Sequence, residues 1–292
     1  MPDDRQVARL AVERAKSVQQ SELPESAWLD MVAQGSASDS MRAAEQLSRA
    51  DAGCIIVLGG DGTVRVVSKA AGTVPLLPIS TGTNNVLPAF IEATVAGLAA
   101  GAVAHGRMPL ETLAYRHKWL EISIDGRSAE RALVDVAVIK GNYVGARAVW
   151  SAEGLIELVV TRADPATIGM SAIAGVLRPI DAREPLGLAV SLKPQATRQI
   201  LALLGPGLTA AVGIQSMREL AIGDELELRI TEPVVVALDG EREFSLTRGQ
   251  HLVVRLREDG PWIVDSQQVM RELVISRFLD IRRVNNDDET NT

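Results

Sequence analysis

Apolar positions follow a helical spacing in the first third of the chain, interrupted by short continuous apolar runs. Spacings of three and four residues predict amphipathic helices, and continuous runs of about five residues bounded by glycines are typical of strands buried on both faces of a parallel sheet. The expected helices cover residues 4–19, 38–50, 63–71 and 91–105, and the expected strands cover 54–58 and 75–79. This alternation predicts a doubly wound, Rossmann-like α/β sheet.

The pattern changes to alternation of apolar and polar residues after Pro109. Residues 120–124 and 133–139 predict a hairpin, and Asp125-Gly126 between them suits a type I′ turn. Further strands are expected over 186–192, 209–214, 225–230, 234–238, 243–246 and 252–257. We therefore predict a mainly β domain of sandwich type, followed by a helix from residue 265 that packs back at the domain junction.

The predicted organisation has four parts. They are an α/β nucleotide-binding domain over 1–107, a mainly β domain over 108–264, a returning helix over 265–284 and a disordered acidic tail over 285–292. At 292 residues and 47% apolar residues, the chain is long enough to bury two cores.

Charge and cysteine content restrict the partners and the compartment. The net charge of −7 disfavours general binding to nucleic acid or to anionic lipid surfaces. Cys54 is the single cysteine and cannot form an internal disulfide, which favours a reducing compartment. No window approaches 18 consecutive apolar residues and the N-terminus lacks the apolar part of a signal peptide, so we expect a cytoplasmic location without stable membrane insertion.

Two glycine-containing loops follow the two predicted parallel strands. Gly59-Gly60-Asp61-Gly62-Thr63 comes directly after the first strand, and 80–85 comes after the second. Such loops meet in one crevice at the carboxyl ends of the strands, where backbone N–H groups can approach phosphates. A tight turn without a ligand is the alternative for the first loop alone. The nearby cations Arg65, Lys69 and Lys140 are expected on solvated faces.

The standard nucleotide signatures are absent, but a family resemblance is present. Neither a P-loop nor the complete dinucleotide fingerprint occurs. The residues GGDGTVR, followed by VPLLPISTGTNNVLP, VDVAVIKGNYVGARAVW and ALDGERE, resemble the acetoin-catabolism protein X group of ATP-NAD kinase-like proteins. That group lies in the superfamily of NAD kinases and diacylglycerol and sphingosine kinases. The resemblance covers roughly residues 50 to 279.

The resemblance implies an ATP- and Mg²⁺-dependent kinase site with Asp61 and Glu241 as catalytic residues. Asp61 would orient or deprotonate the acceptor hydroxyl. The implied nucleotide contacts are Gly59, Gly60, Gly62, Thr63, Thr81, Gly82, Thr83, Asn84 and Asn85, and the implied substrate contacts are Asp135, Arg147, Asp239 and Gly240. It also implies a homo-oligomer built through the β domain. The identity of a metal-binding residue stays open.

Departures from the family pattern leave the phosphoryl acceptor open. Leu133-Val134-Asp135-Val136 stands where NAD kinases carry an Asn-Glu pair, and the first strand of both kinase branches has no counterpart here. The first hypothesis is a kinase acting on a hydroxyl of NAD, which would produce NADP, or of a related small molecule in acetoin catabolism. The alternatives are a lipid or small-molecule kinase and a non-catalytic nucleotide-binding regulator. The missing fingerprint glycine disfavours a Rossmann oxidoreductase.

Overall fold

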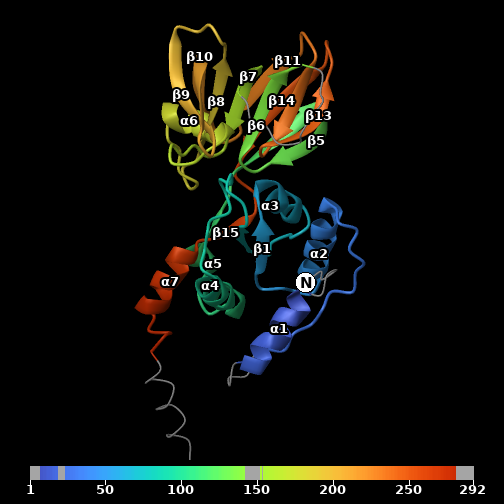
Figure 1. Ribbon diagram of the computed structural model, residues 1–292, viewed down its shortest axis with the longest axis vertical. Helices are drawn as coiled ribbons and strands as arrows, with labels where there is room; N and C mark the ends of the chain where they lie inside the picture. Colours follow the sequence, from blue (N-terminus) through green and yellow to red (C-terminus); the bar gives the residue numbers. More distant parts are fainter. Residues whose placement is uncertain (1–6, 19–23, 142–151, 153, 281–292) are drawn as a thin grey trace, which may run out of the picture.

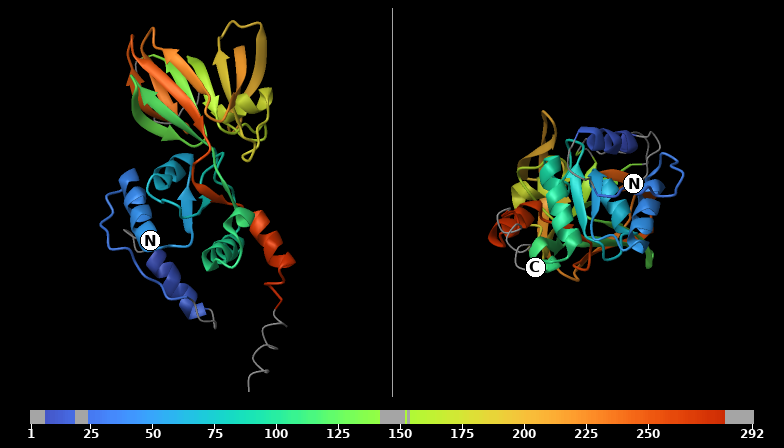
Figure 2. Two further views of the ribbon diagram at one scale, coloured as in Figure 1. Left: turned by 180° about the vertical axis from the view of Figure 1, so that it is seen from behind. Right: turned by 90° about the horizontal axis from the view of Figure 1, so that it is seen from below.

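The protein consists of an α/β domain and a β domain joined at a narrow junction (Figure 1). A computed structural model describes residues 7–18, 24–141, 152 and 154–280. Helix α3 lies at the end of the α/β domain that faces the β domain, whereas α1 (Val7–Val18) and the C-terminal helix extend from the opposite end (Figures 1 and 2). The prediction of an α/β domain followed by a mainly β domain is confirmed.

The α/β sheet has four strands in the order β1-β2-β15-β3. Strands β1 (Ile55–Gly59) and β2 (Leu76–Ser80) are parallel, and β15 (Trp262–Val264) pairs parallel to β2. Strand β3 (Ala114–Arg116) pairs antiparallel to β15. Strands β3 and β15 lie within residues 108–264, which the sequence assigns to the β domain, but their hydrogen bonds join them to this sheet.

Helices pack on both faces of this sheet. Helices α2 (Ala37–Arg49) and α3 (Asp61–Ser68) share a core with Ile55 and Val57 of β1. The opposite face carries α4 (Ala93–His105), whose alanines pack with Leu77 and with the C-terminal helix α7 (Ser266–Ile275). The short α5 (Leu110–Leu113) also contacts α7. The predicted return of the C-terminal helix to the first domain is therefore confirmed, through its packing against α4.

The β domain contains two antiparallel sheets that enclose a common core. The seven-stranded sheet has the order β13-β12-β6-β7-β8-β10-β9, and the four-stranded sheet has the order β11-β14-β4-β5. Their bounds are β4 Trp119–Ile124, β5 Arg127–Ala132, β6 Asp135–Lys140, β7 Leu155–Val160, β8 Leu186–Leu192, β9 Arg198–Gly205, β10 Leu208–Ala221, β11 Glu225–Arg229, β12 Val234–Leu238, β13 Glu241–Leu246 and β14 His251–Arg257.

Alternating apolar residues from both sheets fill the space between them. Leu120 and Ile122 of β4 pack with Val136 of β6 and Leu252 of β14. Helix α6 (Met170–Leu177) covers a second core on the seven-stranded sheet. Asp125 and Gly126 have φ angles of 51° and 75°, both positive as the predicted type I′ turn requires, and they join β4 to β5. The predicted partner strand over 133–139 is wrong, because β4 pairs with Arg127–Ala132 and Asp135–Lys140 forms β6 of the seven-stranded sheet. Within the described ranges, no helix is long and apolar enough to span a membrane.

Candidate functional site

The first glycine loop passes directly from strand β1 into helix α3. Gly59 is the last residue of β1, Gly60 is the N-cap and Asp61 begins the helix. A Cβ atom on Gly60 would lie 2.7 Å from Oδ1 of Asn85, and one on Gly59 would lie 2.6 Å from Oγ1 of Thr63. The absence of a side chain therefore permits a close approach at both positions. The first-turn N–H groups of α3 form an end of positive potential at this loop.

The second glycine loop lies beside the first. Gly59 pairs with Ser80 in the parallel register, so both strands end at the same level. The Ser80 hydroxyl donates to the carbonyl of Gly82 over 2.9 Å, and Nδ2 of Asn85 donates to Oγ of Ser80 over 2.8 Å. Thr81, Gly82 and Thr83 are exposed. The structure thus brings the two predicted loops together and leaves the tip of the second open to a ligand.

Gly169 of the β domain also approaches the second loop, which the sequence alone did not indicate. A Cβ atom on Gly169 would lie 2.9 Å from Oδ1 of Asn84. Gly169 has a φ of 97° and is the N-cap of α6. The contact joins positions that are 85 residues apart, so no local sequence pattern reveals it.

Asp61 links the two loops through its carboxylate. Its Oδ1 accepts a hydrogen bond from the N–H of Leu87 (2.8 Å), and its Oδ2 accepts one from the N–H of Val86 (2.9 Å). The side chain is buried, and burial raises the pKa of Asp61 to about 7 although both amide donors oppose the rise. A carboxyl group with such a pKa can exchange a proton near neutral pH.

The acidic turn between β12 and β13 is fixed by Asp239. The φ angles of Asp239 and Gly240 are 50° and 77°, so both residues adopt the left-handed conformation. The Asp239 carboxylate accepts hydrogen bonds from the N–H groups of Leu133, Val134 and Asp135, at 3.0, 2.7 and 3.2 Å. These backbone donors occupy the carboxylate of Asp239, the residue for which the resemblance implies a contact with the substrate.

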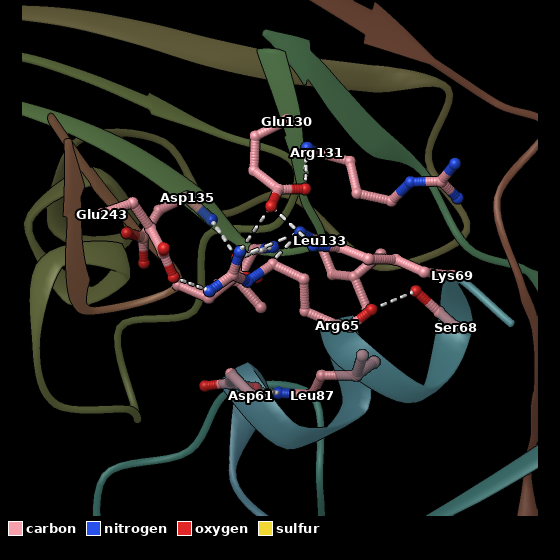
Figure 3. A network of polar contacts seen from close by, with 12 residues as sticks. Asp61, Arg65, Ser68, Lys69, Leu87, Glu130, Arg131, Leu133, Asp135 and Glu243 are labelled. Carbon is pink, nitrogen blue, oxygen red and sulfur yellow. Dashed lines mark hydrogen bonds and ion pairs between the residues drawn. The ribbon is translucent and has the colours of Figure 1, made fainter. Parts of the chain in front are cut away.

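Arg65 joins α3 to this acidic turn (Figure 3). Its Nε lies 3.3 Å from Oδ2 of Asp239, and its guanidinium also contacts Glu243 and lies 3.7 Å from Oε2 of Glu130. The Arg65 side chain is only 3% exposed, so the expectation of a solvated face is wrong for this residue. Arg65 and Asp239 are 174 positions apart, and the sequence therefore carries no local signal for their pairing.

Asp135 lies behind the acidic turn in a buried position. Its Oδ1 has no hydrogen-bond partner in the described part of the chain. Burial raises the pKa of Asp135 well above its usual range, and the carboxylates of Asp239 and Asp61 raise it further. All of these effects favour the neutral form of the Asp135 carboxyl group. A protonated carboxyl group can donate a hydrogen bond, which an Asp in its charged form cannot do.

A pocket of about 700 Å³ opens beside the first turn of α3. Glu241 reaches this pocket from β13, and its Oε1 lies 3.1 Å from the place where a Cβ on Gly62 would be. The lining also includes Thr63, Lys69, Glu130, Glu243 and residues 35–41. Asp61, Asp135 and the second loop do not line it. Arg147 lies outside the described residues, and the described ranges contain no group of three His, Cys, Asp or Glu side chains suited to a metal ion.

Comparison with known proteins defines the class of this chain by its two halves. Residues 5–108 match the ATP-NAD kinase N-terminal domain, and residues 118–259 match the Acetoin catabolism protein X C-terminal domain. The chain is 37% identical over 280 residues to Acetoin catabolism protein X of Cupriavidus necator, covering 93% of this chain and 78% of that protein. The chain therefore belongs to the acetoin catabolism protein X family, which confirms the resemblance.

Two solved structures also resemble the protein. Yeast NADH kinase complexed with NADH is 16% identical with a TM-score of 0.47, covering 75% of this chain and 64% of that one. An NAD kinase from Archaeoglobus fulgidus in complex with ATP is 15% identical with a TM-score of 0.41, covering 93% of this chain and 94% of that one. The chain thus spans about two thirds of the yeast chain's length.

Proposed function

We propose that this protein is an ATP-dependent phosphotransferase that phosphorylates a hydroxyl group of NAD or of a related small molecule. The observation that carries the proposal is the double hydrogen bond from Val86 and Leu87 to Asp61. It places one titratable carboxyl group between two glycine loops at the end of a parallel sheet, which is where α/β proteins bind nucleotides. Membership of the acetoin catabolism protein X family and the ATP-NAD kinase N-terminal domain support the same reaction class.

The loops fit a nucleotide by their shape and their polar groups. Gly60 and Gly62 add no side chain of their own at the N-terminus of α3, and such a helix end attracts phosphate. Thr81 and Thr83 present hydroxyl groups from the neighbouring loop. When bound, ATP with Mg²⁺ would supply the phosphoryl group, and the Glu241 carboxylate, which lies against Gly62 in the first turn of α3, could hold the metal–phosphate complex.

Asp61 is the residue that we assign to the acceptor hydroxyl. Positioning and charge neutralisation dominate phosphoryl transfer, and a carboxylate orients the hydroxyl and takes its proton. Burial raises the pKa of Asp61 to about 7, which makes the carboxyl group a stronger base than an exposed aspartate. The buried position also removes competing water from the Asp61 oxygens.

Purified protein tests this proposal with ATP, Mg²⁺ and a set of acceptors. NAD, NADH, a hydroxyketone and diacylglycerol vesicles are each incubated with γ-labelled ATP, and labelled products are separated. We expect transfer to a soluble acceptor and its loss in Asp61→Asn. Absence of any labelled product above the Asp61→Asn background would contradict the proposal. Labelling of diacylglycerol alone would instead support the lipid-kinase alternative.

A second candidate function is a non-catalytic nucleotide-binding regulator. The observation that favours it is the position of Asp61, whose two carboxylate oxygens are both engaged by backbone N–H groups. In this alternative Asp61 fastens the loops and performs no chemistry. Calorimetry showing ATP binding together with no transfer to any acceptor would support the regulator and would contradict the kinase.

A further inference from the structure

The buried guanidinium of Arg65 connects the two domains at their narrow junction. Arg65 extends from α3 in the α/β domain, and its three carboxylate partners belong to the β domain. Figure 3 shows Arg65 with two of them, Glu130 and Glu243. These partners are Asp239 in the β12–β13 turn, Glu243 in β13 and Glu130 in β5. The planar guanidinium can meet several carboxylates at once, which a lysine ammonium on a flexible stem does less well.

Asp239 provides a rigid attachment point for Arg65. Three successive backbone N–H groups, from Leu133 to Asp135, donate to its carboxylate, and its own N–H donates to the carbonyl of Asp135 over 2.9 Å. The side chain is 0% exposed. The connection between β5 and β6 therefore fixes both the backbone and the side chain of Asp239, and Arg65 binds a point that cannot readily move.

Glu241 follows Asp239 by two residues. Two residues span at most about 7 Å of extended chain, so the position of Asp239 limits the position of Glu241. The Glu241 carboxylate lies against Gly62, at 3.1 to 3.4 Å from the place where a Cβ would be. The same turn thus makes one contact with the middle of α3 through Asp239 and another with its first turn through Glu241.

Charge explains why this arrangement depends on Arg65. The interface contains the carboxylates of Asp239, Glu243 and Glu130, and Lys69 pairs with Glu130 over 2.5 Å. Without the guanidinium, the carboxylates of Asp239 and Glu243 would lose their cation in a partly dry interface, and removal of one partner from a buried ion pair is strongly destabilising. The attraction that holds the β12–β13 turn against α3 would then be lost.

We propose that Arg65 and Asp239 are positioning residues whose ion pair holds Glu241 against the glycine loop. The pair sets the distance between the β12–β13 turn and α3, and with it the width of the pocket in which Gly62, Thr63 and Glu241 meet. Its effect on turnover rests on the proposed phosphotransferase function, whereas the positioning itself does not. Neither residue touches the reacting atoms in this proposal.

Cross-linking measures the positioning without any enzyme activity. Thr63→Cys and Glu241→Cys are combined with Cys54→Ser. The rate of closure is the rate at which a short bifunctional thiol reagent links the two introduced thiols. We expect Arg65→Met and Asp239→Asn to slow closure at least ~10-fold, with Arg65→Lys in between. The control is Arg178→Met, which removes a cation that also has two carboxylate partners, Glu184 and Glu219, but lies away from α3.

Kinetics on otherwise wild-type protein measures the consequence for turnover. Arg65→Met is expected to lower kcat by ~10- to 100-fold, because misplacement of catalytic groups acts on the rate. The affinity for ATP, measured by calorimetry, should change less than ~3-fold, and Arg65→Lys should recover part of kcat. Closure rates equal to the Arg178→Met control in folded Arg65→Lys and Asp239→Asn would overturn the positioning. Slowed closure in a protein that shows no phosphotransfer would retain the positioning and contradict only the proposed function.

Discussion

The Asp61 carboxylate accepts a 2.8 Å hydrogen bond from the backbone N–H of Leu87. Asp61 begins α3, and Leu87 follows the second glycine loop, so this bond and its neighbour at Val86 bind the two loops into one unit. A buried carboxylate with two amide donors is well satisfied, which explains how Asp61 is retained in a buried position.

Replacement of Asp61 separates its structural and chemical contributions. Asp61→Ala leaves two buried N–H groups without an acceptor and should lower the free energy of unfolding by roughly 1 to 3 kcal/mol. Asp61→Asn retains one acceptor oxygen and should be less destabilising. Both variants should lose ~100-fold or more in phosphotransfer rate, because neither carries a proton-accepting group. Urea denaturation and steady-state rates check this, and an Asn variant with wild-type turnover would contradict the assignment of Asp61.

The raised pKa of Asp61 predicts the pH dependence of turnover. The proton-accepting form is the carboxylate, whose fraction increases as the pH rises through about 7. We expect kcat/KM to rise about tenfold from pH 6 to pH 7.5 and then to level off, as measured in a constant-ionic-strength buffer series. The contribution of Asp61 to stability has the opposite sign. Its folded pKa lies above the unfolded value of 3.8, so stability falls as the pH rises between these two values.

The sequence predicted the elements that depend on local pattern. The apolar run before GGDGT became β1, and the Asp125-Gly126 pair formed its expected turn, because both depend on residues that are adjacent in the chain. Strands β3 and β15 were not predicted as members of the first sheet. Each has three residues, and Ile263 pairs with Tyr115 from nearly 150 positions away, so their assignment depends on tertiary contacts alone.

In the candidate site too, the features set by local sequence were predicted and those set by tertiary contacts were not. The two glycine loops were predicted to converge because parallel strands end at one edge, and the structure places Gly60 against Asn85. The role of Arg65 was not predictable, since an arginine next to buried valines on a helix usually extends to solvent. Its burial depends on carboxylates supplied by β5, β12–β13 and β13. Burial also raises the pKa values of Asp61 and Asp135, and a sequence motif does not reveal whether a side chain is buried.

Gly60→Ala tests the close approach of the two loops. The φ of Gly60 is −100°, so an alanine meets no conformational strain, but its Cβ would lie 2.7 Å from Oδ1 of Asn85. Asn85 must then move and weaken its hydrogen bond to Ser80. We expect the ATP dissociation constant, measured by calorimetry, to rise at least ~10-fold, because in the proposed function both loops contact the nucleotide.

The matched control for this variant is Gly97→Ala in α4, where a Cβ meets no atom within 4 Å. Alanine in a helix interior is favoured over glycine by roughly 1 kcal/mol, so this variant should be more stable and bind ATP unchanged. Equal ATP affinity of the two variants would show that the loop contact plays no part in nucleotide binding.

His117 predicts how the stability of the domain junction responds to acid. The ring is fully buried between β3 and β4, with Nε2 at 3.0 Å from the carbonyl oxygen of Leu133. Its Nδ1 has no partner in the described residues. Burial lowers the pKa of His117 to about 4, and the positive charges of Lys118 and Arg162 lower it further. Folding therefore requires a neutral ring.

The sign of the effect follows from these values. Between pH 6.5 and pH 4 the unfolded chain binds a proton at His117 that the folded chain does not bind, so stability falls as the pH falls through this window. The full loss is about 3 kcal/mol, at 1.36 kcal/mol for each pKa unit. His117→Gln can keep a hydrogen bond to the Leu133 carbonyl without titrating. Its unfolding free energy should depend less steeply on pH than that of the wild type over the same window.

Urea denaturation at half-unit steps from pH 4 to pH 7 measures the difference between the two proteins. Asp61 and Asp239, whose pKa values burial raises to about 7 and about 6, contribute a slope of opposite sign. That slope is present in both proteins and cancels in the comparison. Parallel curves for His117→Gln and wild type would show that the ring titrates with the same pKa in the folded and unfolded states, which would contradict a buried neutral ring. A gap that widens below pH 6.5 would establish His117 as a buried neutral residue.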